Sequence, residues 1–141
     1  MNMSHRLLLI LAASLAVVVL IGLIWLISRY RHKIHPLYFK QQWLELQKFC
    51  ASRETWPLAV INADKLLDEA LKKRRLKGKS MGERLVSAQR QLSNNDGVWF
   101  AHNLAKKLVG EASLKLRESD VKKSLVGVRQ ALRDLGALHD K

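Results

Sequence analysis

Few side chains in this 141-residue sequence are of the types that nucleophilic, acid–base or metal chemistry requires, and they are scattered along the chain. The sequence contains no phosphate-binding loop, no C-x-x-C pair, no H-E-x-x-H and no nucleophile elbow. A metal site needs ligands that converge, and only His102 among the histidines lies inside a predicted soluble helix. The five histidines are His5, His32, His35, His102 and His139. We therefore predict no catalytic residue, no metal and no cofactor, and expect that the protein is not an enzyme.

The remaining reactive side chains have structural interpretations. We interpret His102 as a helix histidine with a hydrogen-bonded ring. Cys50 lies on an apolar face and is predicted to be a small core residue rather than a nucleophile. Because it is the only cysteine, an intramolecular disulfide is excluded. Asp64 and Asp68 share a helix face without a visible partner base, so we expect them to be solvated or ion-paired.

The most concentrated chemical feature is positive charge, with six cations in eight residues. It has two interpretations: a solvated helix end followed by a loop, or an electropositive patch for nucleic acid, anionic lipid or an acidic protein. No aromatic residue interleaves with these cations, so base stacking is not supported. The candidate patch for an anionic partner consists of Lys72, Lys73, Arg74, Arg75, Lys77 and Lys79.

The element that positions this charge in the cell is the apolar segment from Leu7 to Ile27. It has 21 residues and no charge. As a helix it would be about 31 Å long, which matches the hydrocarbon thickness of a bilayer. Ser28 and the residues after it offer no small-x-small cleavage site, so we predict an uncleaved transmembrane helix rather than a signal peptide.

Basic residues on the two sides of this segment predict its orientation. Arg6 precedes it, and a larger basic group follows it, which favours the C-terminal side as cytoplasmic. The predicted location is therefore the cytoplasmic (inner) membrane, crossed once. Trp25 and Tyr30 lie where aromatic rings favour the interface. The residues expected to contact anionic headgroups, each gaining about 1 kcal/mol, are Arg29, Arg31 and Lys33.

The sequence divides into four parts. We predict a lead over 1–6, the transmembrane helix over 7–27, a basic juxtamembrane hinge over 28–36 and a cytoplasmic helical domain over 37–141. The hinge is predicted because Pro36 disfavours helix at the residue before it. All 12 acidic residues and 24 of the 25 Lys and Arg follow residue 27, which gives this later part a net charge of +12.

Apolar residues spaced three and four apart predict that the domain after the hinge is all-α, a bundle of about five helices. Ser80 and Glu83 form a capping-box pattern. Ser119 or Asp120 is expected to cap the last helix, and Gly136 to end it. Gly78 is expected to break the chain after the second helix. The predicted helices cover about 37–52, 55–75, 81–92, 97–109 and 119–136.

Four stretches between Ile61 and Leu138 resemble an uncharacterised family of small bacterial helical proteins. They are Asn62–Asp68, Met81–Leu85, Trp99–Leu104 and Asp134–Gly136. In that family a helical core commonly follows an N-terminal membrane anchor. The resemblance implies a fold and a topology, but no activity that can be carried over.

Many such proteins continue the A-H-x-x stretch as A-H-x-x-R-N-x-x-x-H, which is similar to the Arg…His motif of HEPN ribonucleases. Here the cation is kept in part, as Lys106, followed by Lys107. Gly110 stands in place of the motif histidine. Phosphodiester cleavage would lose its general acid–base group without that imidazole. The resemblance therefore implies a degenerate HEPN-like region rather than an active nuclease.

Two functions remain open from the sequence. The first is a membrane-anchored, non-enzymatic interaction module whose basic helical domain faces the cytoplasm and binds a protein, anionic lipid or both. The second is a nucleic-acid-binding module, suggested by the net charge and by Lys106 and Lys107.

Overall fold

The computed structural model describes residues 2–31, 33–111 and 113–139. The chain forms two compact units, Met1–Lys33 and Ile34–Lys141. In the described ranges the regular structure is helical throughout, without a strand, which confirms the prediction of an all-α fold.

The first unit is one long helix, α1 (Met3–Arg31). It begins within the segment predicted as a lead and extends beyond Ile27 at its other end. Its apolar side chains from Leu7 to Ile27 are all exposed in the chain itself. A helix of this length and composition is compatible with membrane anchoring, and a signal sequence near an N-terminus satisfies the same criterion.

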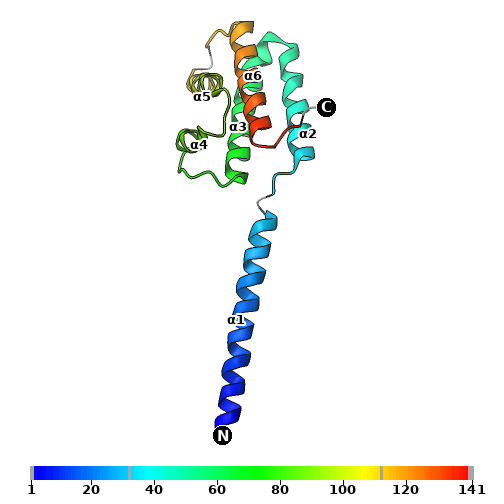
Figure 1. Cartoon of the computed structure of the whole chain (residues 1–141). Helices are drawn as coiled ribbons and strands as arrows, with labels where there is room; N and C mark the ends of the chain where they lie inside the picture. Colours follow the sequence, from blue (N-terminus) through cyan, green and yellow to red (C-terminus); the bar gives the residue numbers. More distant parts are fainter. Residues whose placement is uncertain (1, 32, 112, 140–141) are drawn as a thin grey trace. The chain divides into compact units, whose positions relative to one another are not determined.

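Over its described residues the second unit contains five α-helices and two short 3₁₀ helices, which confirms the predicted bundle (Figure 1). The central helix is α3, which contacts each of the other four α-helices. The elements in chain order are α2 (Pro36–Gln47), η1 (Lys48–Ala51), η2 (Arg53–Thr55), α3 (Trp56–Lys73), α4 (Met81–Ala88), α5 (Asn95–Gly110) and α6 (Glu118–Asp134).

Helix α2 begins at Pro36, and His35 before it is extended, as proline requires of its neighbour. The α-helix ends at Gln47 rather than near Ser52, and the chain continues as 3₁₀ turns. Side chains from the next segment explain this early end. Thr55 Oγ1 donates to the Phe49 carbonyl at 2.6 Å, and Trp56 Nε1 donates to the Cys50 carbonyl at 3.1 Å. These bonds satisfy carbonyls that an α-helix would otherwise have used.

The core follows the predicted apolar stripes. In α2, Phe39, Trp43 and Leu46 are buried, so this face packs in the bundle. Apolar residues at the same three- and four-residue spacing in the later helices are also fully or nearly fully buried. They are Val60, Ala63, Leu66, Leu67, Ala70, Leu71, Leu85, Ala88, Leu92, Val98, Ala101, Ala105, Leu108, Val121, Val128, Leu132 and Leu135.

Capping side chains begin two of the helices. Ser80 Oγ accepts from the Glu83 N–H at 3.2 Å, as the capping box predicts. Asn94 Oδ1 accepts from the Gly97 N–H at 3.0 Å. The expectation that Ser119 or Asp120 caps α6 was wrong, because the N-cap is Arg117, which makes no side-chain capping bond.

The two longest bundle helices end in the same hydrogen-bond pattern with different residues. After α6, Gly136 has φ +76° and the Ala137 N–H donates to the Leu132 carbonyl at 2.8 Å. After α3, the left-handed residue is Arg75 with φ +57°, and the Leu76 N–H donates to the Leu71 carbonyl at 3.1 Å. The helix therefore ends just before Arg75, close to the predicted end, and Gly78 follows in the loop with φ +151°.

Helices α5 and α6 approach each other backbone to backbone at a pair of glycines. A Cβ placed on Gly127 of α6 would lie 2.6 Å from the carbonyl carbon of Gly97 and 2.7 Å from its oxygen. Backbone atoms cannot move aside as a flexible side chain can. The crossing therefore requires glycine at residue 127.

We expect Gly127→Ala to lower the free energy of unfolding by about 3 kcal/mol, because the added methyl overpacks this crossing. Gly110→Ala is the matched control, since a Cβ there meets no atom within 4 Å. It should be neutral or slightly stabilising. Urea unfolding of the full chain in detergent micelles, followed by tryptophan fluorescence, measures both. Equal stability of the two variants would contradict the close approach.

Candidate functional site

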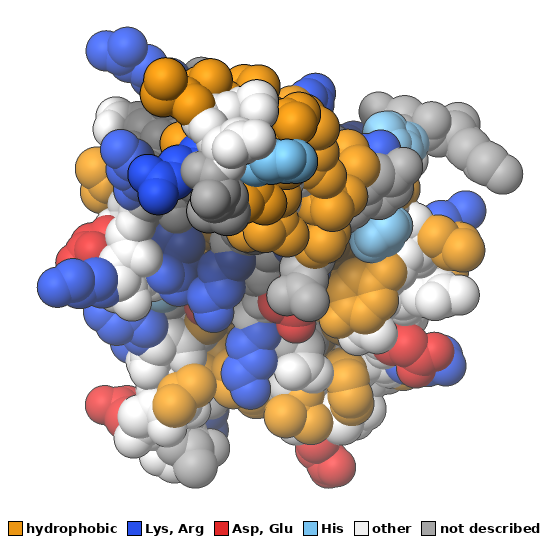
Figure 2. Space-filling model, turned by 90° about the horizontal axis from the view of Figure 1, so that it is seen from below, with side chains coloured by type: hydrophobic (Ala, Val, Ile, Leu, Met, Phe, Trp, Pro, Cys, Tyr) orange, Lys and Arg blue, Asp and Glu red, His pale blue; other side chains and the backbone are white. Residues whose placement is uncertain are grey.

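The candidate site is the run Lys72–Lys79, called here the basic segment. Lys72 and Lys73 form the last turn of α3, and the other four cations lie on the loop to α4. All six cationic side chains are exposed. Lys and Arg side chains are spread widely over the face of the molecule seen in Figure 2.

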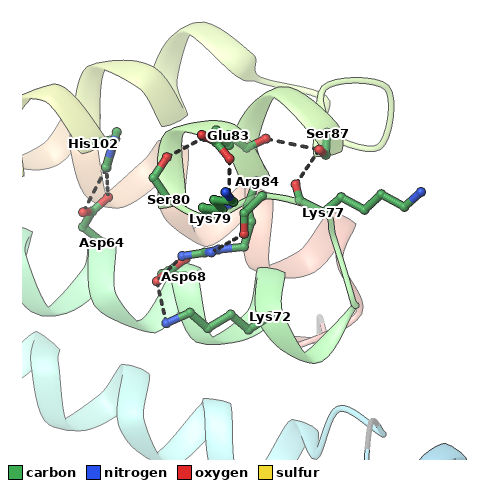
Figure 3. Close-up of polar contacts among 11 residues, drawn as sticks. Asp64, Asp68, Lys72, Lys77, Lys79, Ser80, Glu83, Arg84, Ser87 and His102 are labelled. Atoms are coloured by element: carbon green, nitrogen blue, oxygen red, sulfur yellow. Dashed lines mark hydrogen bonds and ion pairs between the residues drawn. The ribbon is translucent and has the colours of Figure 1, made fainter.

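The backbone of the basic segment is held by the adjoining helix α4 (Figure 3). The Ser87 hydroxyl donates to the Lys77 carbonyl at 2.6 Å. Arg84 Nη1 donates to the Gly78 carbonyl at 2.9 Å, and the Lys79 N–H donates to Glu83 Oε2 at 2.7 Å. Three successive residues of the loop are thus bonded to α4. The loop is ordered by its backbone, which leaves its cationic side chains directed to solvent.

Gly78 lets the loop pass close to the start of α4. Its φ is +151°, a conformation that side-chain-bearing residues rarely adopt. A Cβ at this position would also lie 2.7 Å from the Arg84 backbone nitrogen and 2.7 Å from the Glu83 Cβ. The role of Gly78 is therefore close packing of the loop on α4, not termination of α3.

A buried ion pair joins α4 to α3. Arg84 Nε donates to Asp68 Oδ1 at 2.8 Å and Nη2 donates to Oδ2 at 3.0 Å, which is bidentate geometry. The two side chains are only 10% and 18% exposed. Lys72 Nζ adds a third contact to Asp68 at 3.0 Å. One guanidinium therefore connects the centre of the bundle to the loop, because Arg84 also binds the Gly78 carbonyl.

Asp68 is stabilised in its charged form by these partners. Partial burial acts to raise the pKa of its carboxyl. The hydrogen bonds and positive charges of Arg84 and Lys72 outweigh burial, and the pKa of Asp68 lies below its usual range. Asp68 is therefore ionised at neutral pH and remains so into mild acid.

A second polar pair links α3 to α5. His102 Nδ1 lies 3.1 Å from both carboxylate oxygens of Asp64, and both side chains are largely buried. Burial raises the pKa of Asp64, although the bond and charge of His102 act in the opposite direction. The His102 and Trp99 rings also lie edge to face, with their centroids 6.0 Å apart. The interpretation of His102 as a bonded helix histidine is confirmed, and Asp64 is its partner.

Sequence reasoning missed Arg84 and the pairing of Asp64 with His102. A signal for Arg84 was present, because it lies three residues after Met81 and four before Ala88, on the buried side of α4. A charge on an apolar stripe requires an opposite charge, and Asp68 provides it. No comparable signal identified Asp64 and His102 as partners, since they are 38 residues apart.

The remaining predicted residues lie elsewhere. Arg29 lies over the Trp25 ring on α1, 5.1 Å from its centroid, while the side chains of Arg31 and Tyr30 fall outside the described residues. Lys33 is exposed just after α1. Cys50 is half-buried, and burial raises the pKa of its thiol, which disfavours the reactive thiolate.

A scan against protein-family models, a search of curated proteins and a search of solved structures found no match to this chain. In the described residues no three His, Cys, Asp or Glu side chains are grouped as a metal site would need.

We expect Arg84→Met to lower the free energy of unfolding by about 3 kcal/mol. The substitution leaves Lys72 as the partner of Asp68 and removes the hydrogen bond from Arg84 to the Gly78 carbonyl. Amide hydrogen exchange of the loop residues should rise in the same variant. Arg90→Met is the control, since Arg90 is an exposed cation just after the same helix. Unchanged stability and exchange in Arg84→Met would contradict the proposed connection.

The pKa of Asp68 predicts a change of stability with pH. Because its folded pKa is depressed, Asp68 stabilises the fold above about pH 4, the ordinary range of an aspartate, and this contribution is lost as the pH falls through the folded value. Asp68→Asn should therefore be most destabilising at neutral pH and progressively less so in acid. Urea unfolding over a pH series measures the difference in free energy of unfolding between the unaltered chain and Asp68→Asn. Asp96→Asn is the surface control. A difference that stays constant into acid would contradict this assignment.

Proposed function

We propose that this protein is a single-pass, membrane-anchored interaction module with no enzymatic activity, whose basic helical domain faces the cytoplasm. The observation that carries the proposal is the construction of the basic segment. Three side chains of α4, those of Glu83, Arg84 and Ser87, hold its backbone in place. Its six cationic side chains are exposed, and Lys72 also pairs with Asp68. Like charges held this close repel one another, so an anionic partner would be favoured there.

The long apolar helix α1 supports the anchoring part of this proposal. Its exposed apolar surface is far larger than soluble proteins tolerate, and a bilayer would cover it. The excess of basic residues after the helix supports a cytoplasmic domain in the inner membrane. The partner of the domain would then be an acidic protein, anionic lipid headgroups or both, met at the membrane surface.

The proposal that the protein is not an enzyme rests on the roles of its reactive side chains. Asp64 and His102 bind each other and thereby join α3 to α5. Asp68 and Arg84 join α3 to α4 in the same way. Because each of these groups is committed to a packing contact, each has a structural role that requires no substrate.

A nucleic-acid-binding module is the second candidate. Lys106 and Lys107 are both exposed on α5, and Lys106 borders a hollow together with Lys65. Such binding would weaken steeply with added salt, because counterions are released from the phosphate backbone. Gly110 lies at the end of α5 in an open position, where the HEPN-like motif has its histidine.

A charge-neutralised chain tests the first proposal. In this variant all six cations of the basic segment are replaced by Gln, and the control is Lys106→Gln with Lys107→Gln. Proximity labelling in the native cell, with the labelling enzyme fused to the C-terminus, should mark cytoplasmic proteins of one complex. We expect labelling by the six-residue variant to fall at least tenfold, which corresponds to a loss of about 1.4 kcal/mol of binding free energy. The control should keep it.

Other outcomes of this experiment point elsewhere. Unchanged labelling, together with unchanged binding of the six-residue variant to anionic vesicles, would contradict the proposed role of the basic segment. Enrichment of ribosomal or RNA-bound proteins, lost in the Lys106 and Lys107 control, would favour the nucleic-acid alternative. Labelling of extracytoplasmic proteins only would overturn the orientation.

A further inference from the structure

A groove lies between α2 and the end of α6, on residues that the proposed function does not use. Its volume is about 340 Å³, within the range of small-molecule sites. The apolar part of its lining comes mainly from α2, with Leu37, Trp43 and Leu44, and Leu138 adds to it. Leu37 and Leu44, two turns apart on α2, are 69% and 52% exposed.

Most of the polar lining is cationic, with Gln47 and His139 as its other polar side chains. Lys40 from α2 and Arg129 and Arg133 from α6 border the groove, and no acidic residue is among the described residues that line it. Apolar and cationic side chains side by side match the chemistry of an anionic amphiphile. The Trp43 indole N–H is also buried and has no hydrogen-bond partner among the described residues.

Only a short connection along the chain separates the anchor from the first residue of this groove. Helix α1 ends at Arg31 and α2 begins at Pro36, which is the first residue of the groove lining. Five residue steps span at most about 18 Å, in any arrangement of the two units. If α1 crosses a bilayer, the first turn of α2 stays within reach of its surface. The amphiphile present there at the highest concentration is phospholipid.

We propose that the groove between α2 and α6 binds one anionic phospholipid of the anchoring membrane. Its phosphate lies against Lys40 and Arg129, and part of an acyl chain covers Leu37 and Leu44. This inference rests on the proposed membrane anchor but not on the basic segment. Bound lipid would hold the helical domain against the membrane surface and limit the directions in which the basic segment can face.

The test uses the full chain with Trp25, Trp56 and Trp99 replaced by Phe, so that Trp43 is the only fluorophore. This chain is reconstituted into phosphatidylcholine vesicles that contain a fixed fraction of either brominated phosphatidylglycerol or brominated phosphatidylcholine. Bromine on the acyl chain quenches tryptophan only at close range. We expect the phosphatidylglycerol probe to quench Trp43 several-fold more than the phosphatidylcholine probe. Equal quenching by the two lipids would overturn the proposal.

Paired variants separate the charge of the groove from charge elsewhere. Lys40→Gln with Arg129→Gln should abolish the preference for phosphatidylglycerol. Lys72→Gln with Lys73→Gln removes the same charge from the basic segment and should leave the preference intact. Loss of the preference in both variants to the same degree would overturn the proposal, because it would indicate general attraction to an anionic surface.

A second pair of variants tests the apolar side chains that line the groove. Leu37→Ser with Leu44→Ser should remove most of the quenching, whereas Val86→Ser with Val126→Ser, two apolar residues exposed elsewhere on the bundle, should not. Unchanged quenching in the first pair would overturn the placement of the acyl chain.

A further measurement needs no tryptophan replacement. The unaltered chain, extracted in mild detergent from vesicles of both lipids, should retain phosphatidylglycerol by mass spectrometry, and the Lys40 and Arg129 variant should not. Failure of the chain to float with any vesicles would overturn the anchor and this proposal together. Flotation without retained phosphatidylglycerol would overturn this proposal alone.

Discussion

The bidentate ion pair between Asp68 and Arg84 is the interaction on which the surface of the helical domain depends. It joins α4 to the central helix α3, and the same guanidinium binds the carbonyl of Gly78. Without it α4, only eight residues long, would be attached mainly by the apolar side chains Leu85 and Ala88. The ion pair fixes the orientation of this short helix on α3, because bidentate geometry permits few relative orientations of a guanidinium and a carboxylate.

The ion pair also explains how the structure tolerates its concentrated positive charge. Six cations in eight residues repel one another and would favour an extended, mobile loop. The negative charge of Asp68 lies beneath them and binds both Arg84 and Lys72. Ser87 and Glu83 hold the backbone on either side of Gly78. The bundle thus keeps this charge at a defined place in the fold.

Membrane anchoring would place both proposed sites, the basic segment and the groove between α2 and α6, close to the bilayer surface. A domain tied to a bilayer by a short connection meets lipids and membrane-bound partners at high effective concentration, so weak sites become occupied. The groove between α2 and α6 and the basic segment are on different elements of the bundle. Occupation of the groove by lipid would orient the domain, and the basic segment would then be presented in a limited set of directions.

The sequence by itself determined the apolar length of α1, the all-α class, the buried stripes and the capping box at Ser80, because each depends on spacing within one segment. It also located the basic segment. Only the tertiary structure paired Asp64 with His102 and Asp68 with Arg84, showed that Gly127 lies against Gly97, and closed the groove between α2 and α6. These features join residues from different helices, and helix periodicity carries no information about which faces meet. The left-handed backbone of Arg75, just after α3, belongs with them. The packing of Leu76 against the core and its N–H bond to the Leu71 carbonyl override the weak preference of arginine for that conformation.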